Sequence, residues 1–98
     1  MAFERKTWCS FTEEGIKKYV SSGSGVYGIY GPNGLLYVGE SNNMERRLLE
    51  HLNESGTCIK RGSPTDCTWE EVANNQRRVA RQDVLILALA PSCNKKLG

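Results

Sequence analysis

Four polar side chains between residues 27 and 51 are of types that can move protons or hold an anion. Tyr27 and Tyr37 are ten residues apart, and Arg47 and His51 are four residues apart. Phenol and imidazole groups can transfer protons, and a guanidinium is always charged and can hold two oxygens of an anion at once. Singly, each residue has an ordinary explanation as a core aromatic, an ion-pair partner or a surface histidine. They become informative only if the fold brings them together.

The two tyrosines lie in the pattern of a β-hairpin. Short aromatic and β-branched runs at residues 26–30 and 35–39 surround the turn residues Pro32, Asn33 and Gly34. A type I′ turn at Asn33-Gly34 would leave Pro32 at a strand end, where it has no N–H to donate. A type I turn followed by a glycine bulge suits this proline better.

The register of the hairpin decides which side chains share a face. The type I turn with a bulge pairs Gly31 with Leu35, Ile29 with Tyr37 and Tyr27 with Gly39. Because alternate residues of a strand point to the same side, Tyr27 and Tyr37 then lie on one face. Gly39 beside them leaves room for a close approach to the backbone.

Three helices are expected, at about residues 12–21, 42–53 and 75–89. Thr12 is suited to cap the first helix, and Asn42 with Glu45 three residues later forms a capping-box pattern for the second. Within the second helix, Arg47 and His51 project together from a side next to its apolar stripe.

The third helix, which Pro91 ends, carries a polar residue inside an apolar stripe. Val79, Ile86 and Leu89 recur at helical spacing, and Gln82 falls in the same row. Burying an unpaired amide costs on the order of 1 to 3 kcal/mol. Gln82 must therefore be hydrogen-bonded or functional.

These elements predict an α+β fold with a small three-stranded antiparallel sheet and flanking helices. The third strand, at residues 68–72, is the weakest element because Glu70 and Glu71 are poor strand formers. Ninety-eight residues allow one domain, with residues 1–24 as a helical lead-in and residues 25–94 as the core. The longest apolar run, at residues 84–90, is too short to cross a membrane, and the start lacks a signal peptide. We expect an intracellular, cytoplasmic protein with no membrane partner.

The four cysteines, Cys9, Cys58, Cys67 and Cys93, are expected to be reduced thiols. No secretory signal accompanies them, and no pair has the Cys-x-x-Cys spacing of a zinc site. The chain has a single histidine, so close-spaced ligands for structural zinc are lacking.

The net charge of +2 is too small to indicate a nucleic-acid partner by itself. The basic residues are clustered, which is compatible either with a basic binding surface or with ordinary solvated helix faces. The candidates for contacts with phosphates are Arg46, Lys60, Arg61, Arg77 and Arg78.

Together, the motifs resemble the GIY-YIG nuclease family from about Gly25 to Asn94. Gly-Val-Tyr at residues 25–27, Tyr-Val-Gly at residues 37–39, Arg47 with His51, and Asn94 follow the family's order. The literal letters Gly-Ile-Tyr at residues 28–30 stand too close to the second motif, whereas residues 25–27 have the family's spacing. The hairpin register independently selects Tyr27 as the tyrosine that shares a face with Tyr37.

The resemblance implies a metal-dependent endonuclease that hydrolyses DNA phosphodiester bonds. By this resemblance, Tyr27 and Tyr37 would position and deprotonate the nucleophile, and Arg47 would hold the scissile phosphate. His51 would assist proton transfer, and Asn94 would support the site. A divalent ion, Mg²⁺ or Mn²⁺, would stabilise the leaving oxygen. Since 98 residues leave no room for a second DNA-reading module, recognition would come from the domain's own loops or from a homodimer, with low sequence specificity.

One position departs from the family. Its metal-binding glutamate precedes a Leu-Ile pair by three residues, which here places that function on Gln82. A carboxamide lacks the negative charge with which carboxylates hold Mg²⁺, so metal binding and cleavage should be weak. Either a deliberate Glu-to-Gln change silences an otherwise complete site, which we favour, or the chain is a non-catalytic nucleic-acid-binding module. Glu40 and Asp83 are the candidate substitute ligands, although Asp83 is turned by about 100° from Gln82 on a helix.

Overall fold

The computed structural model describes Phe3 and residues 7–94. Along the chain the elements are β1 (Trp8–Ser10), α1 (Glu13–Tyr19), β2 (Gly25–Gly31), β3 (Gly34–Ser41), α2 (Met44–Asn53), α3 (Cys58–Arg61), β4 (Asp66–Glu71) and α4 (Asn75–Leu89). The strands form one antiparallel sheet in the order β1-β4-β2-β3. The α+β fold with an antiparallel sheet is confirmed, but the sheet has four strands and not three. The additional strand, β1, is three residues long and too short to have a recognisable alternation of its own.

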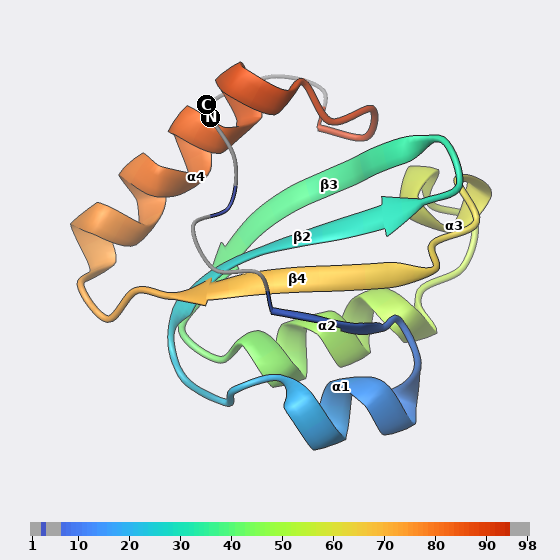
Figure 1. Cartoon of the computed structure of the whole chain (residues 1–98), viewed down its shortest axis with the longest axis horizontal. Coiled ribbons are helices and arrows are strands. Elements are labelled where there is room, and N and C mark those ends of the chain that lie inside the picture. Colours follow the sequence, from blue (N-terminus) through green and yellow to red (C-terminus); the bar gives the residue numbers. More distant parts are fainter. Residues whose placement is uncertain (1–2, 4–6, 95–98) are drawn as a thin grey trace.

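Helices cover both faces of the sheet (Figure 1). We call the side covered by α1 and α2 the Tyr27 face, because Tyr27 and Ile29 of β2 point into that core with Ile16, Met44 and Leu48. We call the other side the α4 face, because Val26 and Val38 pack there against Leu85 of α4. Alternate residues of β2 thus point to opposite faces, and each face is covered by helices. The result is a three-layer arrangement of helices, sheet and helix.

The helix boundaries agree with the sequence patterns to within a few residues. Thr12 caps α1, its hydroxyl accepting a hydrogen bond from the Gly15 N–H. The cap of α2 is Asn43 and not Asn42, because the Asn43 side chain accepts from the Arg46 N–H at 3.0 Å. Helix α4 spans Asn75–Leu89 as expected.

The expected apolar stripe of α4 is confirmed at Ile86 and Leu89, which pack against the core, but is wrong at Val79. Val79 is 39% exposed, whereas Arg78 and Leu85 are the buried residues of the helix. The Arg78 Nε donates to the Glu40 carboxylate at 2.5 Å. The first turn of α4 therefore contacts the sheet through an ion pair between Arg78 and Glu40. The spacing of apolar residues cannot predict such a contact.

A second ion pair explains why β4 is a strand despite its two glutamates. Glu70 is buried on the α4 face and accepts two hydrogen bonds from Arg81, at 3.0 and 2.8 Å. Glu71 is exposed. Both Glu40 and Glu70 are cross-strand partners of Val26, so the two ion pairs flank this central residue.

The hairpin brings the two tyrosines to one face, as expected. Ile29 pairs with Tyr37, and Tyr27 pairs with Gly39. Nearer the turn the expected register was wrong, because Tyr30 pairs with Leu35 and Gly31 with Gly34, which leaves Leu36 as the extra residue. Gly34 has a φ of 118°, a conformation in which a side chain would be strained.

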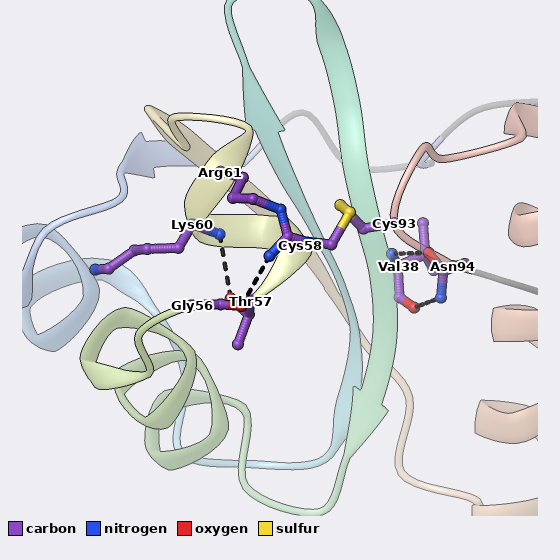
Figure 2. The surroundings of a disulfide bond; sticks show 8 residues. All are labelled: Val38, Gly56, Thr57, Cys58, Lys60, Arg61, Cys93 and Asn94. Carbon is purple, nitrogen blue, oxygen red and sulfur yellow. Dashed lines mark hydrogen bonds between the residues drawn. A yellow bond between two sulfur atoms is a disulfide. The ribbon is translucent and has the colours of Figure 1, made fainter.

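Two of the four cysteines contradict the expectation of reduced thiols. Cys58, at the start of α3, and Cys93, after α4, form a disulfide with a Cα–Cα distance of 5.7 Å (Figure 2). The other two, Cys9 and Cys67, are free and oppose each other on β1 and β4. Helix α3 itself was not expected, because four residues within a polar loop carry no periodic signal.

Candidate functional site

Three rings meet on the Tyr27 face, between the hairpin and α2. The Tyr27 hydroxyl lies 2.9 Å from Nε2 of His51, and Tyr27 is 1% exposed. The Tyr37 ring centroid lies 6.3 Å from that of Tyr27 and 5.2 Å from that of His51. Tyr30, from the literal Gly-Ile-Tyr letters, packs instead against Trp8 of β1. The structure thus brings together Tyr27, Tyr37 and His51.

Gly39 makes this cluster sterically possible. A Cβ atom at this position would lie 2.5 Å from the Tyr27 hydroxyl oxygen and 2.8 Å from Cε2 of Tyr37. The group that approaches the backbone here is therefore the Tyr27 phenol, which crosses over Gly39 toward α2. Any larger residue would push the two tyrosines apart.

Burial determines the protonation of this pair. Desolvation raises the pKa of Tyr27 well above its ordinary value, and the neighbouring Tyr37 adds to the shift. Desolvation also lowers the pKa of His51, with Arg47 contributing in the same direction. At neutral pH the phenol is protonated and the imidazole is neutral, so the pair shares one hydrogen bond without net charge.

Arg47 lies at the rim of the cluster, one helical turn before His51. Its Nη1 is 3.1 Å from Oε1 of Glu50 and 3.6 Å from Oε2 of Glu54, and its side chain is 37% exposed. A half-exposed guanidinium beside a phenol can bind a phosphate group from solvent by donating hydrogen bonds to its oxygens. Without a phosphate, the carboxylates of Glu50 and Glu54 hold the Arg47 guanidinium in this position.

Asn94 has a structural position at the outer edge of β3. Its Oδ1 accepts from the Val38 N–H at 2.8 Å, and its Nδ2 donates to the Val38 carbonyl at 3.0 Å (Figure 2). The backbone N–H groups of Ser92 and Cys93 donate to Leu35 and Leu36. Residues 92–94 thereby cover the edge of the strand that carries Tyr37 and Gly39.

Replacing Asn94 with alanine should loosen this edge. We expect a loss of about 1–2 kcal/mol in the free energy of unfolding, because two hydrogen bonds are removed while the Val38 groups gain access to water. Amide exchange of Val38 should accelerate. Ser92→Ala is the matched control, since Ser92 donates only through its backbone. Unchanged Val38 exchange in Asn94→Ala would show that the edge is held without the side chain.

Gln82 lies on the opposite side of the sheet from Tyr27, Tyr37 and His51, because α4 covers the α4 face. It lies on α4 between Arg78, which contacts Glu40, and Leu85, which packs with Val38. The sheet therefore lies between Gln82 and the tyrosines. Gln82 is partly buried, and its side chain makes no hydrogen bond to the described residues, Phe3 and residues 7–94.

The residues present do not fit a tightly held divalent ion. Within the described part of the chain, no group of three His, Cys, Asp or Glu residues could hold a metal. The Glu40 carboxylate, a candidate substitute, is engaged by Arg78. Gln82 alone would offer one uncharged oxygen, whereas Mg²⁺ is usually bound through at least one carboxylate.

The candidate phosphate-binding residues have different surroundings. Arg46 is on the exposed side of α2, with its side chain 65% exposed, and Arg77 is exposed at the start of α4. Lys60 and Arg61 are exposed but donate to the backbone carbonyls of Leu52 and Gly56. Arg78 does not match the expectation of a surface contact, because its guanidinium is buried and shared by the side chains Glu40 and Asn75.

Sequence reasoning missed Glu54, which lies next to His51. Its Oε1 is 3.4 Å from Nδ1 of His51, and it is the C-cap residue of α2. The available signal was its position three residues after His51, which places it on the same side of the helix.

The sequence and the fold of the chain are similar to those of known proteins. Residues 23–87 match the GIY-YIG catalytic domain, which is more than half of the chain. Two solved structures of the GIY-YIG N-terminal endonuclease domain of UvrC from Thermotoga maritima have the same fold. Each is a point mutant with tyrosine replaced by phenylalanine, bound to its catalytic divalent cation. Both have a TM-score of 0.70 and cover 83% of this chain and 96% of their own, at 21% and 20% identity.

No curated protein sequence matches the chain significantly. None of the helices in the described part of the chain is long and apolar enough to pass through a membrane. The match to the catalytic domain extends over both tyrosine motifs, α2 and most of α4, which are the elements that build the site described above. The chain belongs to the GIY-YIG catalytic domain family.

Proposed function

We propose that this nuclease domain binds DNA across the rim of the Tyr27 face and that its underlying activity is metal-dependent hydrolysis of phosphodiester bonds. The carrying observation is the cluster in which the Tyr27 phenol contacts His51 while Arg47, one helical turn before His51, is partly exposed to solvent. A proton donor and acceptor next to a solvent-accessible guanidinium suit an attack on a phosphate. The relatives with this fold are endonuclease domains, which supports the same reaction.

We further propose that Gln82 leaves cleavage weak or absent. The family's activity depends on a divalent ion, Mg²⁺ or Mn²⁺ in our proposal, and Gln82 supplies no negative charge at the ligand position. The cluster of Tyr27, His51 and Arg47 supports the part of the proposal that concerns phosphate binding. A non-catalytic nucleic-acid-binding module is the second candidate, and the absence of a metal-binding cluster among the described residues favours it.

Gln82→Glu discriminates between the two candidates. We expect it to nick supercoiled plasmid in the presence of Mg²⁺ or Mn²⁺ at least tenfold faster than the unchanged chain, because a carboxylate restores charge at the ligand position. Calorimetric titration with Mn²⁺ should show tighter binding in parallel. Cleavage sites on unrelated duplexes should vary, since phosphate contacts carry no sequence information.

Gln76→Glu is the matched control, because it adds the same charge to α4 at an exposed position in its first turn. It should change neither Mn²⁺ affinity nor nicking. If Gln82→Glu stays inert with both metals while DNA affinity is intact, the binding module is the correct function and the nuclease proposal fails.

A further inference from the structure

His51 is the single histidine of the chain, and both of its ring nitrogens are in defined surroundings. Nε2 faces the Tyr27 hydroxyl at 2.9 Å. Nδ1 is buried and has no hydrogen bond of good geometry, but Oε1 of Glu54 lies 3.4 Å away. The imidazole is thus placed between a phenol and a carboxylate.

The chemistry of these two neighbours selects one tautomer. A neutral imidazole has one N–H donor and one lone-pair acceptor, and a carboxylate can only accept. With the proton on Nδ1, the N–H faces a carboxylate oxygen of Glu54 3.4 Å from Nδ1, and Nε2 accepts from the Tyr27 hydroxyl. The other tautomer would direct the Nδ1 lone pair at the carboxylate, which is repulsive, and would leave the Tyr27 hydroxyl without an acceptor at His51.

We infer that Glu54 is a positioning residue that holds the His51 proton on Nδ1 and thereby keeps Nε2 free to accept the proton of Tyr27. When Tyr27 gives its phenol proton to Nε2, His51 becomes an imidazolium, and the Glu54 carboxylate beside Nδ1 stabilises that charge. The catalytic consequence rests on the proposed function, whereas the tautomer does not.

The remaining charges around His51 are compatible with this assignment. Arg47 contacts Oε2 of Glu54, so the two oxygens of Glu54 can serve Arg47 and His51 at the same time. Glu50 contacts Arg46 and Arg47 but has no contact with the imidazole. Tyr37 faces the ring from the hairpin. Among these groups, Glu54 is the acceptor within reach of Nδ1.

Long-range ¹H–¹⁵N correlation spectra test the tautomer directly, because one histidine gives one set of ring signals. At neutral pH we expect the unchanged chain to show protonated Nδ1 and unprotonated Nε2. Glu54→Ala should lose this preference and show either the Nε2–H form or an average of both. Glu50→Ala, which also removes a carboxylate partner of Arg47, should keep the Nδ1–H form.

Two outcomes would overturn the inference: an Nε2–H tautomer in the unchanged chain, or an unaltered Nδ1–H tautomer in folded Glu54→Ala. The first decides the matter even if Glu54→Ala does not fold, and Glu54→Asp then serves as the second variant, which should retain the Nδ1–H form. In the Gln82→Glu background, Glu54→Ala should lower kcat roughly tenfold with little change in KM, a part of the 10²–10⁴-fold typical of general acid–base catalysis. Failure of cleavage in Gln82→Glu itself would contradict the proposed function and leave the tautomer measurement valid.

Discussion

Arg47→Ala in the Gln82→Glu protein should lower the single-turnover cleavage rate by about 10²–10³-fold, the range found when one donor to a developing anion is removed. DNA affinity should change far less. An interaction that strengthens only as charge builds on the phosphate contributes to turnover and not uniformly to binding. The fold should tolerate the change, because the ion pairs of Arg47 with Glu50 and Glu54 are half-exposed and contribute little to stability.

Arg46→Ala is the matched control, because Arg46 precedes Arg47 in the sequence but has a more exposed side chain, at 65%. Its ion pair with Glu50 is long, at 3.9 Å. This substitution should leave the single-turnover rate nearly unchanged, and it should flatten the log-log salt dependence of binding by about one unit if Arg46 contacts a phosphate. DNA titrations at several salt concentrations beside single-turnover assays separate the two effects. Normal cleavage with weakened binding in Arg47→Ala would make Arg47 a docking residue.

The part of the site that the sequence could predict is the part governed by local geometry. Pro32 argued against a type I′ turn at Asn33-Gly34, and the register that followed correctly placed Tyr27 and Tyr37 on one face. The strands reach this register through a bulge at Leu36 that was not predicted. Helical spacing likewise placed Arg47 and His51 on one side of α2. These inferences hold because turn and helix periodicities are set by nearby residues.

The remainder depends on partners distant in the sequence. Glu70 weakened the expectation for β4 because its partner, Arg81, lies on another element. Val79 was wrongly expected to be buried for the same reason, since Arg78 is the buried residue there and a buried Arg78 requires Glu40 to be acceptable in a core. The contact between Tyr27 and His51 joins β2 to α2, elements that are 24 residues apart at this contact, so local sequence patterns do not reveal it.

The disulfide is the largest departure from expectation and gives the second large predicted effect. Cys58 and Cys93 are 35 residues apart, and a cross-link of this span lowers the entropy of the unfolded chain. Loop-closure arguments give about 4 kcal/mol, a large share of the 5–15 kcal/mol typical of small domains. The double variant Cys58→Ala/Cys93→Ala should lose about this amount of unfolding free energy in urea.

The same bond fixes the segment that ends in Asn94. Cys93 lies between Ser92 and Asn94, which bond to the edge of β3, so opening the disulfide should also accelerate amide exchange at Val38. Tyr37 and Gly39 flank Val38 on β3. The disulfide between Cys58 of α3 and Cys93 therefore supports the strand that carries Tyr37 (Figure 2).

A reductant provides the decisive control, since it should act only where the bridge exists. Reduction should destabilise the unchanged chain by as much as the double substitution does, and it should leave the double variant unaffected. Cys9 and Cys67 are free thiols, so thiol titration of the denatured, unreduced chain should detect these two and not all four. Four reactive thiols, together with a urea midpoint that does not respond to reductant, would mean that the edge of β3 is held by Asn94 and its backbone neighbours alone.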